Sequence, residues 1–188
     1  MKLSLRQLQP ADITTITHYW LTSDAAFLEG MGVDLTKLPS PEEWSQMLTE
    51  QINTPLAQKQ SYCLIWEVDG NAVGHSNVNK IVWGEEAYLH LHLWFPEGRK
   101  SGFGTELLKR TLPHFFLDLH LQRIYCEPYA LNPAPNKTLE KVGFHLEKEY
   151  ITTPGWINFE QPVKRWVMHR VQFEALYGPL QDLPVPTA

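Results

Sequence analysis

The chain has 188 residues, a length that suits one domain and is sufficient to bury a real core. It is 43% hydrophobic and 20% charged, as globular proteins are, which argues against a disordered chain. The formal net charge is −5 and no Lys/Arg run exceeds two residues, so nucleic acid is not expected as a partner.

The N-terminal sequence and the cysteine content indicate where in the cell the protein is located. The first residues, MKLSLRQLQPADI, contain no apolar signal core, and no window approaches the ~18–20 apolar residues needed to cross a bilayer. We therefore expect a cytoplasmic protein without a membrane partner. Cys63 and Cys126 are too few for a disulfide framework, and both lie in apolar strand patterns, which favours buried small hydrophobes over a thiol nucleophile.

The N-terminal part predicts one strand and two helices. Residues 2–8 alternate apolar and polar side chains, which is typical of a half-exposed strand. Residues 10–20 have helical spacing after a Pro and an Asp, and residues 40–52 start with Ser-Pro-Glu-Glu, a typical helix N-terminus. Residues 22–40 are rich in Gly, Asp and Ser and predict an ordered loop.

The middle of the chain predicts a meander followed by a helix. Residues 61–95 contain three strand-like runs, separated by turn clusters at 69–71 and 84–86. Helical spacing begins at Gly102, and Pro113 within it predicts a kink or an early end of that helix.

The C-terminal part predicts a strand, a helix and a closing strand pair. Residues 123–129 form the strand, and residues 132–143 a helix that Asn132 caps and Gly143 ends. The closing pair covers residues 144–152 and 163–171. This order predicts an α/β (α+β) fold with a mixed, mostly antiparallel sheet of about seven strands flanked by helices. Residues 1–172 form the domain, and 173–188 a Pro-rich, loosely ordered tail.

A glycine-containing loop, residues 99–105, lies between the third strand of the meander and the next helix. The free N–H groups and dipole of the helix start favour a phosphate or pyrophosphate, and Arg99 and Lys100 add positive charge. A plain strand-to-helix turn is the alternative. The spacing matches neither the dinucleotide fingerprint nor a Walker loop.

The pattern Arg99-x-x-Gly102-x-Gly104 after three antiparallel strands resembles the GNAT superfamily of acetyl-CoA-dependent N-acetyltransferases. A second block, EPYALNPAPNKTLEKVGF from Glu127 to Phe144, is similar to the family's later strand, Asn and helix with its EKxGF ending. The resemblance covers roughly residues 2–170 and looks closest to the ribosomal-protein-alanine acetyltransferase branch.

The resemblance implies direct acetyl transfer, in a ternary complex, from acetyl-CoA to a primary amine of a small molecule or a peptide N-terminus, without a metal. The cofactor-binding residues that it implies are Leu93, Trp94, Phe95, Arg99, Lys100, Ser101, Gly102, Phe103, Gly104, Thr105, Asn132 and Lys137. The first three would offer backbone groups to the pantetheine arm.

The chain also departs from the family pattern. Leu139 replaces the Tyr that many members use as a proton donor, and Tyr88 and Leu89 occupy the neighbourhood of a frequent strand-four Glu. The usual acid and base therefore do not carry over. Two alternatives stay open: an acyltransferase for a hydroxylamine siderophore precursor, and a non-catalytic CoA-binding module of the same fold.

Two imidazoles stand on one face of the strand predicted around YLHLHLWF. If this strand and the run before it pair as a hairpin around Gly84, one plausible register sets His75 opposite His92, Asn77 opposite His90, and Asn79 opposite Tyr88, all on one face. An alkylammonium group must lose a proton before it attacks a thioester, at a cost of about 4.6 kcal/mol at pH 7. Histidine is the natural base near neutral pH.

His90 or His92 is therefore the candidate base, and Tyr88 or Tyr129 a candidate proton donor, although the CoA thiol is acidic enough to leave unaided. The strand histidines have two other interpretations: structural hydrogen bonding to Asn77 or Asn79, and zinc binding, for which no fourth ligand is evident.

Two segments, residues 23–34 and 152–161, are where this family builds its acceptor pocket. Asp24, Glu29 and Asp34 would attract a cationic amine, and Trp156 and Phe159 would supply flat apolar contact, unless these are only solvated acids and core aromatics. The candidate acceptor-binding residues are Glu29, His75, Asn77, Trp156 and Phe159. We expect a monomer or a homodimer.

Overall fold

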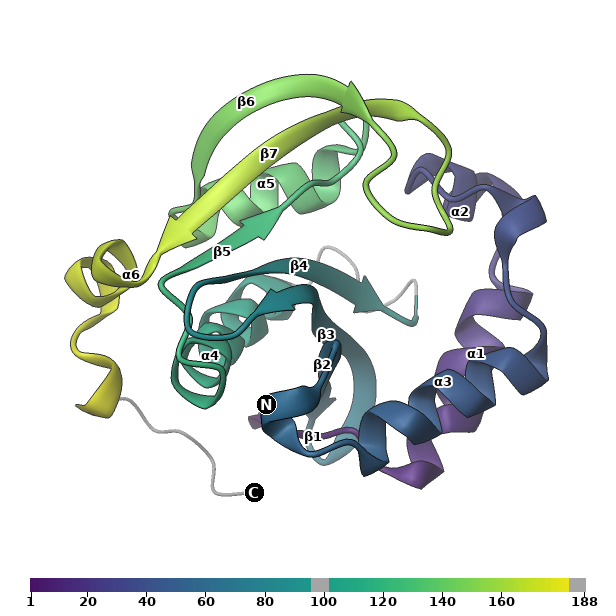
Figure 1. The fold of residues 1–188 in the computed structure, drawn as a ribbon, viewed down its shortest axis with the longest axis horizontal. Coiled ribbons are helices and arrows are strands. Elements are labelled where there is room, and N and C mark those ends of the chain that lie inside the picture. The colour runs from purple at the N-terminus through teal and green to yellow at the C-terminus, as the bar shows by residue number, and fades with distance from the viewer. Residues whose placement is uncertain (96–101, 183–188) are drawn as a thin grey trace.

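The computed structural model describes residues 1–95 and 102–182. One sheet of seven strands runs in the order β1-β2-β3-β4-β5-β7-β6 (Figure 1). All neighbouring strands are antiparallel except β4 and β5, which confirms the predicted mixed sheet. The strands are β1 Leu3–Gln7, β2 Ser61–Val68, β3 Asn71–Val82, β4 Glu86–Leu93, β5 Arg123–Cys126, β6 His145–Thr152 and β7 Gln161–His169.

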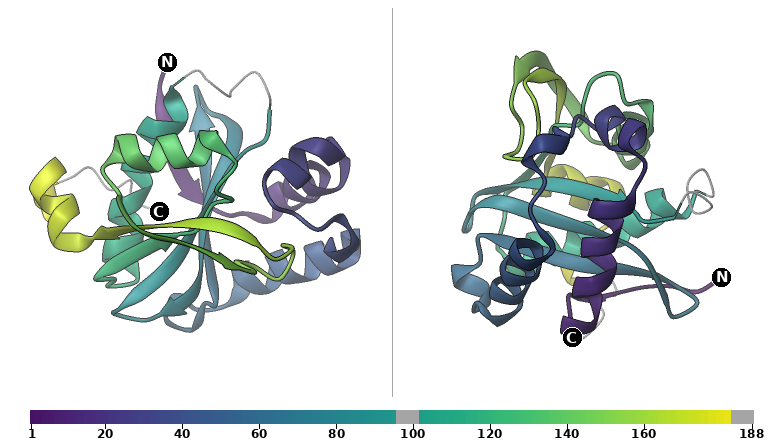
Figure 2. Two further views of the ribbon diagram at one scale, coloured as in Figure 1. Left: turned by 90° about the horizontal axis from the view of Figure 1, so that it is seen from above. Right: turned by 90° about the vertical axis from the view of Figure 1, so that its right-hand side faces the viewer.

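Helices cover both faces of the sheet (Figure 2). Side chains alternate along β2, so that Leu64 and Trp66 pack in a core with α4, while Cys63 and Ile65 pack in a second core with α1 and α3. The helices are α1 Ile13–Thr22, α2 Ala25–Gly30, α3 Pro41–Asn53, α4 Phe103–Asp118, α5 Pro133–Val142 and α6 Arg170–Tyr177, with single 3-10 turns η1 Pro10–Asp12, η2 Leu35–Lys37, η3 Leu56–Gln58 and η5 Leu180–Asp182.

The predicted helix caps are confirmed. The Ser40 hydroxyl accepts from the Glu43 N–H, and the Glu43 carboxylate accepts in return from the Ser40 N–H, a capping box at the start of α3. Asn132 caps α5 by accepting from the N–H of Ala134, and Gly143 ends that helix with a φ of 91°. These local hydrogen bonds fix where the two helices begin and end.

The N-terminal loop prediction was wrong in part. Residues 22–40 contain α2 and η2, because Asp24 accepts from the Phe27 N–H and Asp34 from the Thr36 N–H. Each carboxylate caps the N-terminus of a short helical turn, a signal that the Gly and Asp content of the segment masked.

The helix from Gly102 does not end at Pro113. It continues to Asp118, since Leu112, Phe115 and Phe116 are fully buried in the core and this packing offsets the missing backbone hydrogen bond.

The chain stays packed on the domain to Leu180. Residue 173, the predicted start of the tail, lies inside α6, and the side chains of Phe173 and Leu180 are each 1% exposed. Among the residues described, no helix combines the length and the apolar character that crossing a bilayer requires.

Candidate active site

The sheet opens between β4 and β5. The two parallel strands pair only from Glu86 to Tyr88 on β4, and beyond this point they separate. Along its other edge β4 stays paired with β3, and the Trp94 N–H donates to the Val73 carbonyl at 3.0 Å. Because backbone groups alternate along a strand, the N–H and C=O groups of Leu91 and Leu93 point into the opening.

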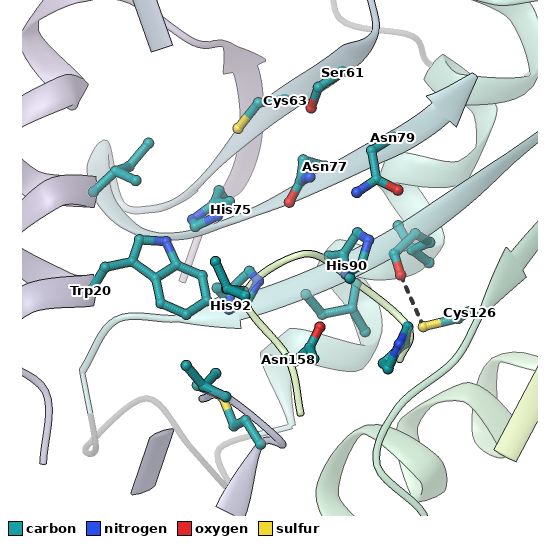
Figure 3. Close-up of a pocket in the computed structure, with 18 of the residues that line it drawn as sticks. Trp20, Ser61, Cys63, His75, Asn77, Asn79, His90, His92, Cys126 and Asn158 are labelled. Atoms are coloured by element: carbon teal, nitrogen blue, oxygen red, sulfur yellow. Dashed lines mark hydrogen bonds between the residues drawn. The ribbon is translucent and has the colours of Figure 1, made fainter. Parts of the chain in front are cut away.

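A cavity of about 820 Å³ extends from this opening across the face of β3 and β4 (Figure 3). Its walls come from α1, α2, α3, the β4–β5 opening, the start of α5 and the β6–β7 loop. A cavity of this size accommodates a small molecule together with part of a cofactor.

The predicted histidine register is confirmed. His75 pairs with His92, Asn77 with His90 and Asn79 with Tyr88. His75, Asn77, Asn79, His90 and His92 all line the cavity, and Figure 3 shows them side by side on one face of the sheet.

Two of the three imidazoles are held by neighbouring side chains. His75 Nδ1 accepts from Trp94 Nε1 at 2.8 Å, and His92 Nδ1 lies 3.3 Å from the Tyr19 hydroxyl. The His75 and His92 rings stack with their centroids 4.7 Å apart. These contacts fix both rings in the wall.

His90 differs from the other two. Its Nε2 is buried and has no hydrogen-bond partner among the described residues, and the Oδ1 of Asn79 is in the same condition. Both atoms belong to cavity-lining side chains of adjacent strands. Buried polar atoms without partners are rare and need an explanation, and a bound molecule that donates hydrogen bonds is one.

Burial makes all three imidazoles poor proton acceptors in the free protein. It lowers the pKa of His75 to about 3 and that of His90 to about 4, with further lowering from His90 and Lys80 respectively. The pKa of His92 also lies well below its usual value because of burial and the other two imidazoles. All three are therefore neutral at pH 7, which corrects the expected base poised near neutrality.

The described cofactor-side residues divide into two groups. Leu93, Gly104 and Asn132 line the cavity, whereas Trp94, Phe95, Gly102, Phe103, Thr105 and Lys137 are not among the lining residues. Trp94 gives its N–H to β3 rather than to the opening, and the carboxamide oxygen of Asn132 is engaged in capping α5. Arg99, Lys100 and Ser101 lie outside the described residues.

The two segments predicted to form the acceptor wall contact each other. Val33 forms a β-bridge with Asn158, and the carbonyl of Gly32 accepts from Asn158 Nδ2 at 2.8 Å and from Gln161 Nε2 at 3.0 Å. The N–H of Asp34 donates to Ile157. These bonds join residues 32–34 to the β6–β7 loop as one wall of the cavity.

Of the predicted acceptor residues on these segments, Trp156 lines the cavity. Phe159 instead packs edge-on against Tyr129, with the ring centroids 5.9 Å apart, and Glu29 is exposed; neither is a lining residue.

Tyr88 belongs to a charged cluster beside the cavity. Its hydroxyl accepts from Arg165 Nη2 at 2.7 Å, and Arg165 Nε also pairs with Glu127 at 2.6 Å. Tyr150 donates to the same Glu127 carboxylate. Burial raises the pKa of Tyr88, so its phenol is protonated at neutral pH, and the phenol is not among the lining groups.

Sequence reasoning missed the aromatic part of the wall. Tyr19 and Trp20 on α1 and Trp44 on α3 line the cavity, although each is at least 93% buried. Their helical spacing is that of ordinary core residues, so no sequence signal separates them from the core. Glu127 also lines the cavity, from the end of β5.

The sheet opens between a parallel strand pair, with a helix start on one side and a polar strand face on the other. The sequence of the chain also matches the profile of a protein family. The profile described as acetyltransferase (GNAT) domain matches residues 2–145. This chain belongs to the GNAT acetyltransferase family. A comparison with curated proteins gave no match.

Solved structures of the GNAT fold from Vibrio cholerae are similar over nearly their whole length. The spermidine N-acetyltransferase in complex with CoA and spermine is 22% identical, with a TM-score of 0.74, and the match covers 91% of this chain and 97% of that chain. A spermidine/spermine N-acetyltransferase from the same organism, in complex with manganese ions, is 23% identical, with a TM-score of 0.70, and the match covers 93% of this chain and 95% of that chain. These likenesses establish the fold of this GNAT member.

Among the described residues, the fold places no further zinc ligand beside the strand histidines. Within residues 1–95 and 102–182, no group of three or more His, Cys, Asp and Glu side chains is arranged to hold a metal ion.

Proposed function

We propose that this GNAT protein transfers the acetyl group of acetyl-CoA to the primary amine of a small molecule held in the cavity on the β3–β4 face. The observation that carries the proposal is the continuity of one cavity from the β4–β5 opening, at Leu93 and Gly104, to the histidine-lined face at His90. A cofactor in the opening and an acceptor on that face would meet.

The residues present fit the cofactor. The backbone N–H and C=O groups of Leu91 face the opening and suit an extended amide-containing arm. Gly102 has a φ of 86°, and a Cβ placed there would meet no atom of residues 1–95 and 102–182 within 4 Å, so these residues leave room at the start of α4 for an anionic group. Arg99, Lys100 and Ser101 stay predicted pyrophosphate ligands. When bound, acetyl-CoA supplies the activated thioester.

His90 is the residue that we place at the reacting amine. Its neutral imidazole accepts a hydrogen bond from the amine N–H and takes up the proton that nitrogen loses as the C–N bond forms and the thioester C–S bond breaks. Because burial disfavours charge, the cavity lowers the pKa of a bound ammonium as it lowers that of the imidazoles. The cavity thus selects the reactive, neutral form of the amine. The leaving thiolate needs no dedicated acid, since a thiol pKa is about 8.5.

The experiment has two parts. Calorimetry measures acetyl-CoA binding, and a thiol-reactive dye follows CoA release with an acceptor panel of alkylamines, arylalkylamines, a hydroxylamine and a peptide with N-terminal alanine. Release that matches the yield of N-acetylated amine supports the proposal. Release with the hydroxylamine alone favours the siderophore-type reaction, and release with the peptide alone favours the ribosomal-protein-alanine acetyltransferase branch. Acetyl-CoA binding without release for any acceptor identifies a non-catalytic module.

A further inference from the structure

Three indole side chains form one aromatic wall in the acceptor part of the cavity. The rings of Trp20 and Trp44 stack, with their centroids 5.5 Å apart and their planes at 11°. The ring centroid of Trp44 lies 6.2 Å from that of Trp156, in the β6–β7 loop. Trp20 also contacts the His92 ring at 4.9 Å. We name Trp20, Trp44 and Trp156 the tryptophan wall. Its members come from three separate elements, and all of them line the cavity.

The charged groups around the cavity are balanced in number and already engaged. The charged lining residues in the described part of the chain are Glu50, Lys59, Lys80 and Glu127. Glu127 pairs with Arg165 and accepts from Tyr150, while the two lysines donate to the carbonyls of Gln51 and Pro154. Glu50 stands exposed on α3 and accepts from Gln46. Of the two described lining carboxylates, Glu127 is paired with a cation, and Glu50, whose described partner is the neutral Gln46 amide, is exposed on α3 and does not lie in the buried interior.

The acidic residues of the α2 segment do not change this balance. Asp24 caps α2, and Asp34 accepts from Thr36 and pairs with Lys37 at 3.4 Å. Glu29 is exposed and does not line the cavity. The structure therefore does not support the prediction that these three acids attract a cationic amine, since none of them lines the cavity.

Four buried polar atoms of cavity-lining side chains have no hydrogen-bond partner among the described residues, and all four are neutral: Trp44 Nε1, Gln51 Oε1, Asn79 Oδ1 and His90 Nε2. Two of the acceptors, His90 Nε2 and Asn79 Oδ1, belong to the sheet. They lie on adjacent strands of one face, with Asn79 diagonal to His90. Two acceptors of this kind suit the N–H groups of one amine.

We infer that the acceptor is an arylalkylamine, an amine that carries at most one positive charge on a flat apolar body, and not a polyamine. The inference rests on the proposed function and names its substrate class. The tryptophan wall receives the flat body, and His90 and Asn79 receive the single amine. In the buried interior, where the described residues offer no carboxylate that lacks a cationic partner, a second or third ammonium group would lose its hydration without compensation, which burial penalises strongly.

The test compares kcat/KM for 2-phenylethylamine, tryptamine, butylamine and spermidine at saturating acetyl-CoA, by thiol release. We expect each aromatic amine to exceed butylamine and spermidine by about 10- to 30-fold, from the apolar area that the ring buries. Spermidine equal to or better than the aromatic amines would overturn the inference and leave the proposed function intact. If acetyl-CoA binds but none of the four amines gives thiol release, the result would contradict both the inference and the proposed acetylation of small-molecule amines.

A matched pair of variants locates the aromatic contact. Trp156 is 56% exposed, so Trp156→Ala should fold, and Trp83→Ala removes a 41% exposed indole from the β3–β4 turn, away from the cavity lining. Trp156→Ala should lower kcat/KM about five-fold for 2-phenylethylamine and less than two-fold for butylamine, while Trp83→Ala changes neither. Equal losses for the two amines in Trp156→Ala would contradict contact with the ring.

Adding a carboxylate tests the charge argument. Met47 lines the cavity and is 37% exposed on α3. Met47→Glu should raise kcat/KM for spermidine about three-fold or more without raising that for 2-phenylethylamine, since only the polyamine has a second ammonium group to pair with it. No gain for spermidine in the folded variant would count against charge as the basis of selection.

Discussion

The free energy of unfolding should fall at acidic pH because His75 is buried in its neutral form. The ring is 4% exposed, and its Nδ1 accepts from Trp94 Nε1, so a proton on Nδ1 would have to displace that hydrogen bond. Burial lowers the pKa of His75 to about 3, below the value of about 6.5 in the unfolded chain. Between these values the unfolded chain binds a proton that the folded protein does not, so stability falls as the pH falls.

The size of this loss follows from the two pKa values. From pH 8 to pH 5 the unfolded imidazole becomes almost fully protonated while the folded one stays neutral, which lowers the free energy of unfolding by about 2 kcal/mol for this residue. Urea unfolding at both pH values measures the loss in the natural chain and in His75→Gln, which keeps an acceptor for Trp94.

The wild type should lose about 2 kcal/mol more than His75→Gln over this pH range. Comparing pH dependences removes any constant cost of the substitution. His145→Gln, which removes an exposed imidazole from β6, is the matched control. Equal losses in wild type and His75→Gln would refute the claim that His75 is neutral and buried in the fold.

Three further predictions concern the cavity. Because burial lowers the pKa of His90 to about 4, log kcat/KM for a primary amine should rise from pH 6 to 9 with a constant slope of about one, following the fraction of free amine, and a slope that falls from about two to about one near pH 6.5 would indicate a base of ordinary pKa. Gly102→Glu should raise the acetyl-CoA dissociation constant at least about ten-fold relative to Gly102→Ala, which has the same backbone strain at φ 86° without the charge; equal constants in calorimetry would count against an anion site. Asn158→Ala removes a bond to the Gly32 carbonyl and should raise the amine KM several-fold with unchanged acetyl-CoA affinity, whereas an unchanged KM would separate this wall from acceptor binding.

Much of the architecture could be predicted because its signals are local. The alternation in β4 and the Gly84 turn were sufficient to set His75 against His92, and Ser40 and Asn132 marked two helix starts by hydrogen bonds within a few residues. The spacing around Gly102 and Gly104 led to the family without any knowledge of the fold.

The rest depends on long-range packing. Trp20 and Trp44 occupy helix faces that look like core in the sequence, and only the meeting of α1 and α3 turns them into a cavity wall. The lowered pKa of His90 likewise arises from burial by distant elements, so the sequence suggested a base of ordinary strength. Asp24 and Asp34 suggested a cation site, but their carboxylates are used in local caps.

Amine-dependent thiol release by His90 variants tests most directly whether the amine reacts on the β3–β4 face. His90→Phe should lower the rate at least about 100-fold, a typical contribution of a positioned base, with acetyl-CoA binding unchanged, and His90→Gln, which keeps a hydrogen-bond acceptor, should lose less. His114→Phe, at a buried histidine of α4 outside the cavity lining, controls for general damage. A His90→Phe protein that binds acetyl-CoA and retains the wild-type rate would contradict the account.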